Sequence, residues 1–438
     1  MEVETKREAY KAVLAKIDNM RQEIVNLLSE LVKRQSVNPK YPELDSGKYL
    51  GGEKICNEYL EKHLSSIGFK TDLFEIEKDR MNLVATVGAG NTLGRSLIFS
   101  GHIDTVPFGN LEKWDSGNPL SGRIFEGKVF GRGACDMKSG IVSMIAAVEA
   151  VLRSGYMFGN QLTVESVVGE ETMDHMLGTS ATVKRGYVGD AAIITEPSSL
   201  HLSPVSTGVI LMKVEVEGKT AHATARDMMI RAGGKGDEIG VNAIEKGVKV
   251  IQILQQLEEQ WGITKRHSLF NPGHFVIHPG LIDGAPHGHR YVAVVPDYCT
   301  IDYAVLYNPA ESPDEVKKEI ADYIFTASKL DTWLSNHPPK IDWQGVWPAG
   351  EISMDHDICK TFSSSHEFVF GSALKIDGFP APVDAPFLDA AGIPTVLFGP
   401  GNLDQAHSEN EYVEIDQLIN SAKTLAVAAM MWCGFSKT

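Results

Sequence analysis

Short apolar runs alternate with helical patterns over the first half of the chain. Residues 82–88, 96–104, 161–170 and 191–197 are apolar runs of strand length, whereas residues 140–155 are apolar over a length that suits a helix. This alternation predicts an α/β fold, in which a mixed sheet is covered by helices on both faces. We also expect helices at 1–36 and 51–68, a strand at 70–76, a strand at 393–401 and a final helix from Asp416.

A different pattern begins at about residue 206. The run 208–218 alternates apolar and polar residues, as a half-exposed strand does. Further patterns follow in the order helix, strand, strand, helix, strand, at 240–261, 274–282, 298–307, 312–328 and 339–345. The complete order, βαββαβ, is that of a ferredoxin-like domain. We therefore predict a catalytic domain formed by residues 1–205 and 348–438 and interrupted by a lid domain at 206–347.

Composition excludes several classes of protein. With 438 residues, the chain is long enough for two compact units. Its formal charge of -16 and the lack of a basic run argue against nucleic acid as a partner. The five cysteines are widely spaced, and no stretch of about 18 apolar residues is present. We therefore expect a cytoplasmic protein that does not bind membranes.

Two segments place polar side chains beside predicted strands or helices. His102 and Asp104 lie at the end of the apolar run 96–104, where the imidazole can bind a metal and the carboxylate can accept its second N–H. Asp136 lies in a glycine-rich loop before an apolar helix. Each signal is weak by itself, because a short H-x-D motif arises by chance and a loop aspartate is commonly a helix cap.

Three more segments strengthen the interpretation as a metal site. Glu170, Glu171 and Glu196 lie at the ends of predicted strands, and His407 lies in the loop after the last one. Ligands of open α/β sheets gather at such ends. Imidazole and carboxylate ligands suit zinc, or manganese or cobalt in its place. Six side chains are too many for one four-coordinate zinc, but they suit two ions about 3.5–4 Å apart that share a carboxylate.

The chain resembles the acetylornithine deacetylase, succinyl-diaminopimelate desuccinylase and aminoacylase family of dizinc metallopeptidases. The matching stretches occur in family order and span nearly the whole chain: SGHIDTVP, GRGACDMKSG, VVGEE, TEP, GKTAHA, GVNAIEKG and GPGNLDQAHSENEYVEI. The resemblance implies a zinc-exopeptidase-like catalytic domain with two divalent ions, most simply zinc. It also implies roles for the site residues: His102 and Glu196 on one ion, Glu171 and His407 on the other, Asp136 as the bridge, and Glu170 as general base.

His222 of GKTAHA lies in the predicted lid. In the family, the matching histidine reaches the active site of the partner subunit and stabilises the tetrahedral oxyanion. The resemblance therefore implies a catalytic role for His222 and a homodimer formed through the lid. The sequence alone supports an exposed lid histidine equally well.

The chain departs from the family at two substrate-binding positions. Where the family has an asparagine and, thirteen residues later, an arginine, this sequence has Ala293 and Leu306. Leucine cannot bind a carboxylate in a bidentate manner. Either another cation, from Arg226, Arg231 or Arg290, replaces the arginine, or the substrate lacks the usual α-carboxylate. For each of these arginines taken singly, a solvated loop is the simpler interpretation.

The leading hypothesis is a metal-dependent amidohydrolase that cleaves the amide of a small N-acyl amino acid or dipeptide-like substrate. One alternative is an aminohydrolase that acts on another C–N bond of an aromatic or uncharged substrate. A second alternative is a non-catalytic metal-containing binding protein. Glu170 argues against the last alternative, because a structural metal site needs ligands but no general base.

Overall fold

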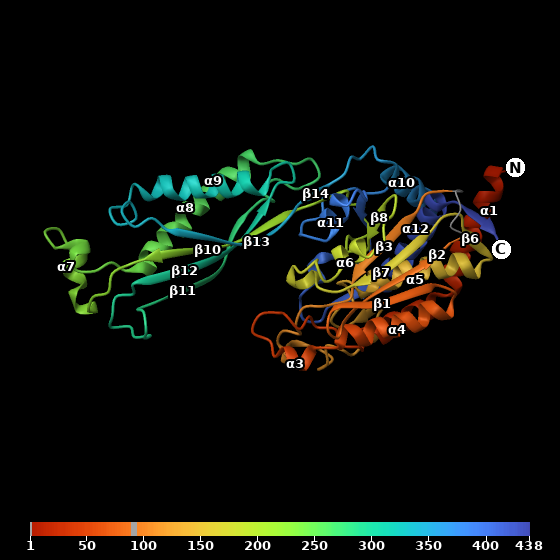
Figure 1. The fold of residues 1–438 in the computed structure, drawn as a ribbon, viewed down its shortest axis with the longest axis horizontal. Coiled ribbons are helices and arrows are strands. Elements are labelled where there is room, and N and C mark those ends of the chain that lie inside the picture. Colours follow the sequence, from red (N-terminus) through yellow and green to blue (C-terminus); the bar gives the residue numbers. More distant parts are fainter. Residues whose placement is uncertain (1, 89–93) are drawn as a thin grey trace. The chain divides into compact units, whose positions relative to one another are not determined.

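The computed structural model describes residues 2–88 and 94–438. Met1, with which the first expected helix begins, lies outside the described residues. The chain divides into two compact units, shown in Figure 1. Unit 1 comprises Met1–Val205, Glu351–Phe379 and Val383–Thr438, and unit 2 comprises Ser206–Gly350 and Pro380–Pro382.

A six-stranded mixed sheet forms the centre of unit 1. Its order is β1-β2-β7-β3-β8-β15. Strands β7, β3, β8 and β15 are parallel to one another, whereas β2 is antiparallel to both β1 and β7. The bounds are β1 Lys70–Glu77, β2 Arg80–Val87, β3 Leu97–His102, β7 Leu162–Val167, β8 Ala192–Ile194 and β15 Thr395–Leu397.

Helices cover both faces of this sheet because neighbouring residues of a strand point to opposite sides. On β2, Leu83 belongs to the large core cluster that contains most of the helices, whereas Val84 packs with Ala181 of α6 on the other face. The helices of the large cluster are α1 Glu2–Asn19, α2 Arg21–Val32, α4 Gly52–Ser66, α5 Lys138–Arg153, α10 Asp357–Phe370 and α12 Ile415–Cys433. Helix α6 is Thr179–Lys184, and α11 is Ala385–Ala390.

Several shorter elements complete unit 1. Strands β4, β5 and β16 form a three-stranded sheet, and β6 pairs with β17. Their bounds are α3 Ser46–Tyr49, β4 Arg123–Phe125, β5 Lys128–Phe130, β6 Tyr156–Phe158, β16 Tyr412–Glu414 and β17 Phe435–Lys437; β9 Val205–Ser206 and β14 Gly350–Glu351 lie where the chain passes between the units.

The N-terminal helix predicted over 1–36 is two helices, so this prediction was wrong in detail. α1 ends at Asn19, α2 begins at Arg21, and α2 ends at Val32. Met20 lies between them, is 3% exposed, and contributes to the core. The break allows the apolar faces of both helices to be buried, and the apolar spacing in the sequence continues across it without a signal.

Unit 2 has the order and pairing of a ferredoxin-like fold. Its antiparallel sheet has the order β11-β12-β10-β13, and α8 and α9 lie on one face of it (Figure 1). Along β12, Ile301, Tyr303 and Val305 are buried, whereas Ala304 and Leu306 on the opposite face are only partly buried. The bounds are β10 Gly208–Glu217, α7 Arg226–Ile230, α8 Ala243–Thr264, β11 Ile277–Ala285, β12 Tyr298–Tyr307, α9 Pro313–Ser328 and β13 Lys340–Trp347.

The boundaries of the insertion differ slightly from those expected. The sequence suggested 206–347, whereas unit 2 extends to Gly350 and includes Pro380–Pro382. Within residues 2–88 and 94–438, no helix has both the length and the hydrophobicity needed to cross a bilayer.

Candidate metal centre

The parallel strands of unit 1 bring the predicted ligands to one edge of the sheet. β3 ends at His102, β7 ends three residues before Glu170, and β8 ends two residues before Glu196. His102 is paired with Val167 in the ladder of β3 and β7, so the two strands end at the same level. Side chains that follow these strands therefore meet at one edge, as the switch-point rule for α/β sheets predicts.

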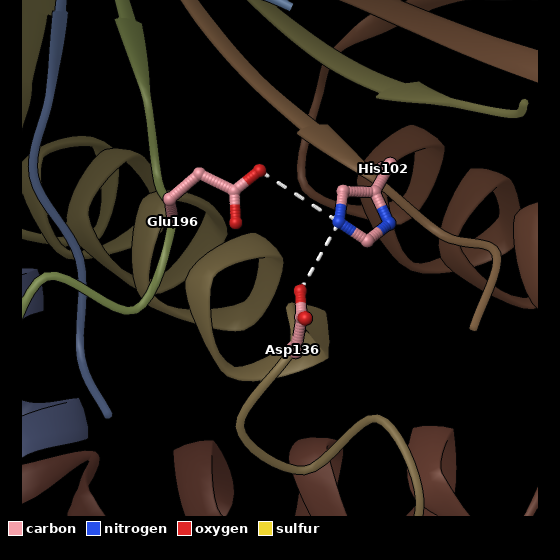
Figure 2. Close-up of side chains that lie close together, drawn as sticks. All are labelled: His102, Asp136 and Glu196. Carbon is pink, nitrogen blue, oxygen red and sulfur yellow. Dashed lines mark ion pairs between the residues drawn. The ribbon is translucent and has the colours of Figure 1, made fainter. Parts of the chain in front are cut away.

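His102, Asp136 and Glu196 form the first group of candidate ligands (Figure 2). The Nε2 atom of His102 lies 3.2 Å from Oδ1 of Asp136 and 3.7 Å from Oε1 of Glu196. All three residues are buried. His102 Nδ1 donates a hydrogen bond to a main-chain carbonyl, that of Asp104, at 2.9 Å. Because a carbonyl can only accept, the neutral imidazole leaves its Nε2 lone pair for a metal.

Asp136, Glu171 and His407 form the second group. The Nε2 atom of His407 lies 3.1 Å from Oδ2 of Asp136 and 3.2 Å from Oε2 of Glu171. Asp136 thus directs one carboxylate oxygen toward each histidine. A carboxylate in this position can bridge two cations.

The spacing of the donor atoms fits a small divalent cation. Zinc bonds of about 2.0–2.1 Å at tetrahedral angles separate two ligand atoms by about 3.3 Å. The four separations above run from 3.1 to 3.7 Å. The donors are imidazole nitrogens and carboxylate oxygens, a set that zinc, manganese and cobalt accept.

Electrostatics also favours a cation here. Burial raises the pKa of Glu196 to about 8 and that of Glu170 well above its usual range. Burial opposes the charge on His407, but hydrogen bonds to Asp136 and Glu171 raise its pKa to about 11. Carboxylates outnumber imidazoles in the cluster, so without a cation some of the buried carboxyls must stay protonated. A bound divalent cation would stabilise the ionised form of these carboxyls and so favour their release of protons.

Glu170 lies beside the first group without belonging to it. Its Oε2 atom is 3.7 Å from His102 Nε2, and 15% of its side chain is exposed. Glu171, the next residue, is in the second group. The two glutamates follow Gly169, which has a φ of 99°, in a short 3-10 turn. The strand has ended there, so strand alternation no longer separates them.

Asp104 occupies a different place from the one expected. We predicted that its carboxylate accepts the second N–H of His102, but this bond goes to the main-chain carbonyl of Asp104. The carboxylate oxygen is 3.8 Å from Nδ1. The carboxylate instead accepts the backbone N–H of Gly169 at 3.0 Å and of Glu171 at 3.2 Å. It therefore holds the turn that carries Glu170 and Glu171.

Two further side chains near the site escaped the sequence analysis. Asn38 donates through Nδ2 to Asp104 at 2.8 Å and to Thr172 Oγ1 at 3.0 Å. Asp384 lines a small cavity with Glu170 and Glu196, accepts a hydrogen bond from Thr179, and has its pKa raised to about 6 by burial. No pattern in the sequence distinguishes Asn38 from a loop asparagine, and Asp384 resembles an ordinary helix-start residue.

Comparison with known proteins identifies the family. Residues 98–431 match the sequence profile of peptidase family M20/M25/M40. The chain belongs to this family. It is therefore a hydrolase that acts on C–N bonds and uses divalent metal, as the sequence predicted. The resemblance stated from the motifs is confirmed.

Family relatives cover the chain almost completely. The N-formyl-4-amino-5-aminomethyl-2-methylpyrimidine deformylase of Halalkalibacterium halodurans is 32% identical, over 97% of this chain and 98% of the relative. The acetylornithine deacetylase of Vibrio vulnificus is 28% identical, over 92% and 97%. Human carnosine dipeptidase 1 has a similar fold, with a TM-score of 0.72 at 14% identity over 97% of this chain and 98% of that structure.

The remaining predicted residues lie in unit 2. His222 is exposed, and its Nδ1 accepts the backbone N–H of Thr224 at 3.2 Å. The main chain of Ala293 lies beside it, since the Ala293 carbonyl accepts the N–H of Ala223 at 2.9 Å. Leu306 pairs with Val209 across the β10 and β12 ladder.

Proposed function

We propose that the chain removes a formyl or similarly small acyl group from an amine carried by an uncharged heteroaromatic substrate. The observation that carries this proposal is Leu306, which takes the place of the arginine that binds a substrate carboxylate in the deacetylases the motifs resemble. Leu306 pairs with Val209, which is also apolar. An apolar position cannot balance a carboxylate, but it suits a neutral ring.

The arginines that could replace the missing cation already have acidic partners. Arg226 pairs with Glu245 at 2.5 Å, and Arg290 pairs with Asp283 at 2.5 Å. Arg231 lies 3.8 Å from Asp227. These contacts favour the interpretation that the three arginines form solvent-exposed ion pairs, and not that one of them binds a substrate carboxylate.

The names of the relatives point in the same direction. The deformylase of Halalkalibacterium halodurans is named for an N-formylated aminopyrimidine, which carries no carboxylate, whereas acetylornithine is an amino acid derivative. The chain is somewhat more similar to the deformylase than to the deacetylase. We therefore narrow the proposed substrate class from N-acyl amino acids in general to N-acyl amines carried by a neutral ring.

For the site, we propose two divalent ions, most simply zinc, with manganese or cobalt as functional substitutes. His102 and Glu196 would hold one, Glu171 and His407 the other, and Asp136 both. Bound there, the ions would act as Lewis acids toward a carbonyl oxygen and lower the pKa of a water. The donor spacing and the shared position of Asp136 support this assignment.

The chain's own residues would then carry the proton. Glu170 accepts the proton of the attacking water and returns it to the departing amine. Asp104 and Asn38 hold the turn on which Glu170 lies. Within the first ligand group, the hydrogen bond from His102 Nδ1 to the Asp104 carbonyl fixes the ring orientation.

We further propose a homodimer through unit 2, in which His222 stabilises the oxyanion in the partner's site. Its Nδ1 accepts an N–H, so the neutral ring holds its proton on Nε2, where an oxyanion can receive it. Exposed apolar side chains on α8 and on the edge strand β11 support the dimer: Val248 is 43%, Leu281 70% and Ile282 53% exposed. The five free, buried cysteines support a cytoplasmic location.

A substrate comparison tests the proposal. We expect kcat/KM to be higher for an N-formylated aminomethylpyrimidine than for N-acetyl, N-succinyl or N-formyl amino acids, measured with added zinc, manganese or cobalt. The substitution Leu306→Arg should shift this ratio toward the carboxylate-bearing substrates. A wild-type preference for N-acyl amino acids would overturn the proposed substrate class.

A further inference from the structure

Two buried charged residues outside the ligand set form an ion pair in unit 1. Arg132 is 2% exposed and Glu411 is 0% exposed, and Arg132 Nη1 lies 2.6 Å from Glu411 Oε2. Burying two charges is costly, and it is tolerated only where further hydrogen bonds complete the pair. The position of those further bonds is therefore informative.

Glu411 uses its second oxygen on the loop of the shared aspartate. Glu411 Oε1 accepts the backbone N–H of Cys135 at 2.8 Å and of Asp136 itself at 3.0 Å. The Glu411 carbonyl also accepts the N–H of Gly131 at 2.9 Å. Glu411 follows His407 by four residues and directly precedes β16, which pairs with β5. One carboxylate thus joins the loop of Asp136 to the loop of His407.

Arg132 extends the connection to a third loop. Its Nε atom donates to the carbonyl of Pro107 at 3.1 Å, five residues after His102. Its own backbone N–H donates to Pro119 at 2.7 Å. The Arg132–Glu411 pair therefore contacts the segment that follows His102 and the loops of Asp136 and His407.

This arrangement matters most for Asp136. Its two oxygens lie 3.2 Å and 3.1 Å from the two histidine nitrogens, so a small rotation of the residue would bring one oxygen closer and move the other away. The backbone N–H groups of Cys135 and Asp136 both donate to the Glu411 carboxylate, and these two hydrogen bonds restrict the rotation. Because Arg132 balances the charge of Glu411, the restraint adds no net negative charge beside the ligands.

We propose that Arg132 and Glu411 are positioning residues that fix the carboxylate of Asp136 between the two metal positions and hold the His407 loop against it. The inference rests on the ligand set of the proposed function. Partners that orient metal ligands without touching the metal typically change metal affinity about 10- to 100-fold when they are removed.

The test uses Glu411→Gln in the full-length protein. The amide has one oxygen and an NH2 group, so it cannot accept both from Arg132 and from the two backbone N–H groups. We expect Zn2+ to bind about 10- to 100-fold more weakly in competition with a chelator. We also expect the visible absorption spectrum of the Co2+-loaded protein to change, because it reports ligand geometry.

Glu53→Gln is the matched control. Glu53 and Arg80 form another fully buried pair, with Arg80 Nε 2.8 Å and Nη2 2.5 Å from the carboxylate. The hydrogen bonds of this pair join Glu53 to Arg80 and not to the loops of Asp136 or His407. This variant should lose stability but keep the Zn2+ affinity and Co2+ spectrum of the wild type. Arg132→Lys keeps the charge but shortens the reach toward Pro107, so its Zn2+ affinity should lie between those of the wild type and Glu411→Gln. This variant replaces Glu411→Gln in the test if Glu411→Gln does not fold.

The outcomes separate this inference from the proposed function. Weaker Zn2+ binding and an altered Co2+ spectrum in Glu411→Gln, with neither in Glu53→Gln, support the positioning role. Unchanged affinity and spectrum in Glu411→Gln, or equal losses in both variants, overturn it while wild-type metal binding leaves the proposed function standing. A wild-type protein that binds no divalent metal overturns the proposed function and this inference together.

Discussion

Replacing Asp104 with asparagine tests whether this residue holds the turn of Glu170, the proposed general base. The carboxylate is fully buried and accepts three N–H groups: Gly169 N on Oδ1, and Asn38 Nδ2 and Glu171 N on Oδ2. Asparagine offers one oxygen, so its better orientation keeps the two bonds made to Oδ2 and turns an NH2 group toward the N–H of Gly169.

The size of the effect follows from these contacts. A hydrogen bond to a charged group contributes about 1.5–3 kcal/mol, so the loss of one and the weakening of two others should lower the free energy of unfolding by about 3 kcal/mol. The released turn carries Glu170. A misplacement of about 1 Å costs about 10²-fold in rate, so we expect kcat to fall by about that factor with little change in KM.

Urea denaturation, elemental analysis of bound metal and steady-state kinetics together check the prediction. The bond from His102 goes to the main chain of Asp104 and survives the substitution, so metal binding at the proposed His102 and Glu196 position should be kept. Wild-type stability and kcat in Asp104→Asn would refute the role of Asp104 in holding the turn of Glu170. Loss of the bound metal at wild-type stability would show instead that the carboxylate acts on His102.

Three further substitutions give distinct expected results. Glu170→Gln should keep its metal while turnover falls about 10²- to 10⁴-fold, and an active variant would remove Glu170 as the base. His407→Ala should lower the metal content measured by elemental analysis, whereas unchanged stoichiometry would exclude it as a ligand. Glu165 is fully buried, and burial raises its pKa to about 8, so the unfolded chain releases this proton at lower pH than the native protein does. The free energy of unfolding should therefore fall as pH rises from about 4.5 to 8. In denaturation curves, Glu165→Gln should remove this pH-dependent loss, which is on the order of 3 kcal/mol at pH 7. The same pH dependence in the wild type and in Glu165→Gln would contradict the prediction.

Most of the secondary structure could be predicted because the length and spacing of each apolar run suit either a strand or a helix, but not both. The strands at 97–102 and 162–167 fall within the expected segments, and each run ends where polar residues begin. Helix α8 starts at Ala243, three residues after the expected start, because the Asn242 side chain caps it. That capping signal was present in the sequence. The break at Met20 had none, since it depends on how two helices reach one core.

The site was predictable to the extent that topology determines it. His102, Glu171 and Glu196 lie at or just beyond the ends of parallel strands, and parallel strands end at one edge, so their proximity follows from the fold. Arg132 and Glu411 could not be identified in this way. In a sequence, a buried ion pair between residues 279 positions apart looks like two surface charges, and only the packing of three loops reveals it.

The insertion of unit 2 determines when the metal centre can be completed during synthesis. Residues up to Glu196 supply most of the candidate ligands, but His407, Glu411 and the edge strand β15 leave the ribosome only after unit 2. Because chains fold from the N-terminus as they emerge, the first segment of unit 1 must wait with a partly formed sheet and an unmatched acidic cluster. A chain truncated after unit 2 would have a nearly complete ligand set and still lack one histidine, the restraint on Asp136 and the last parallel strand.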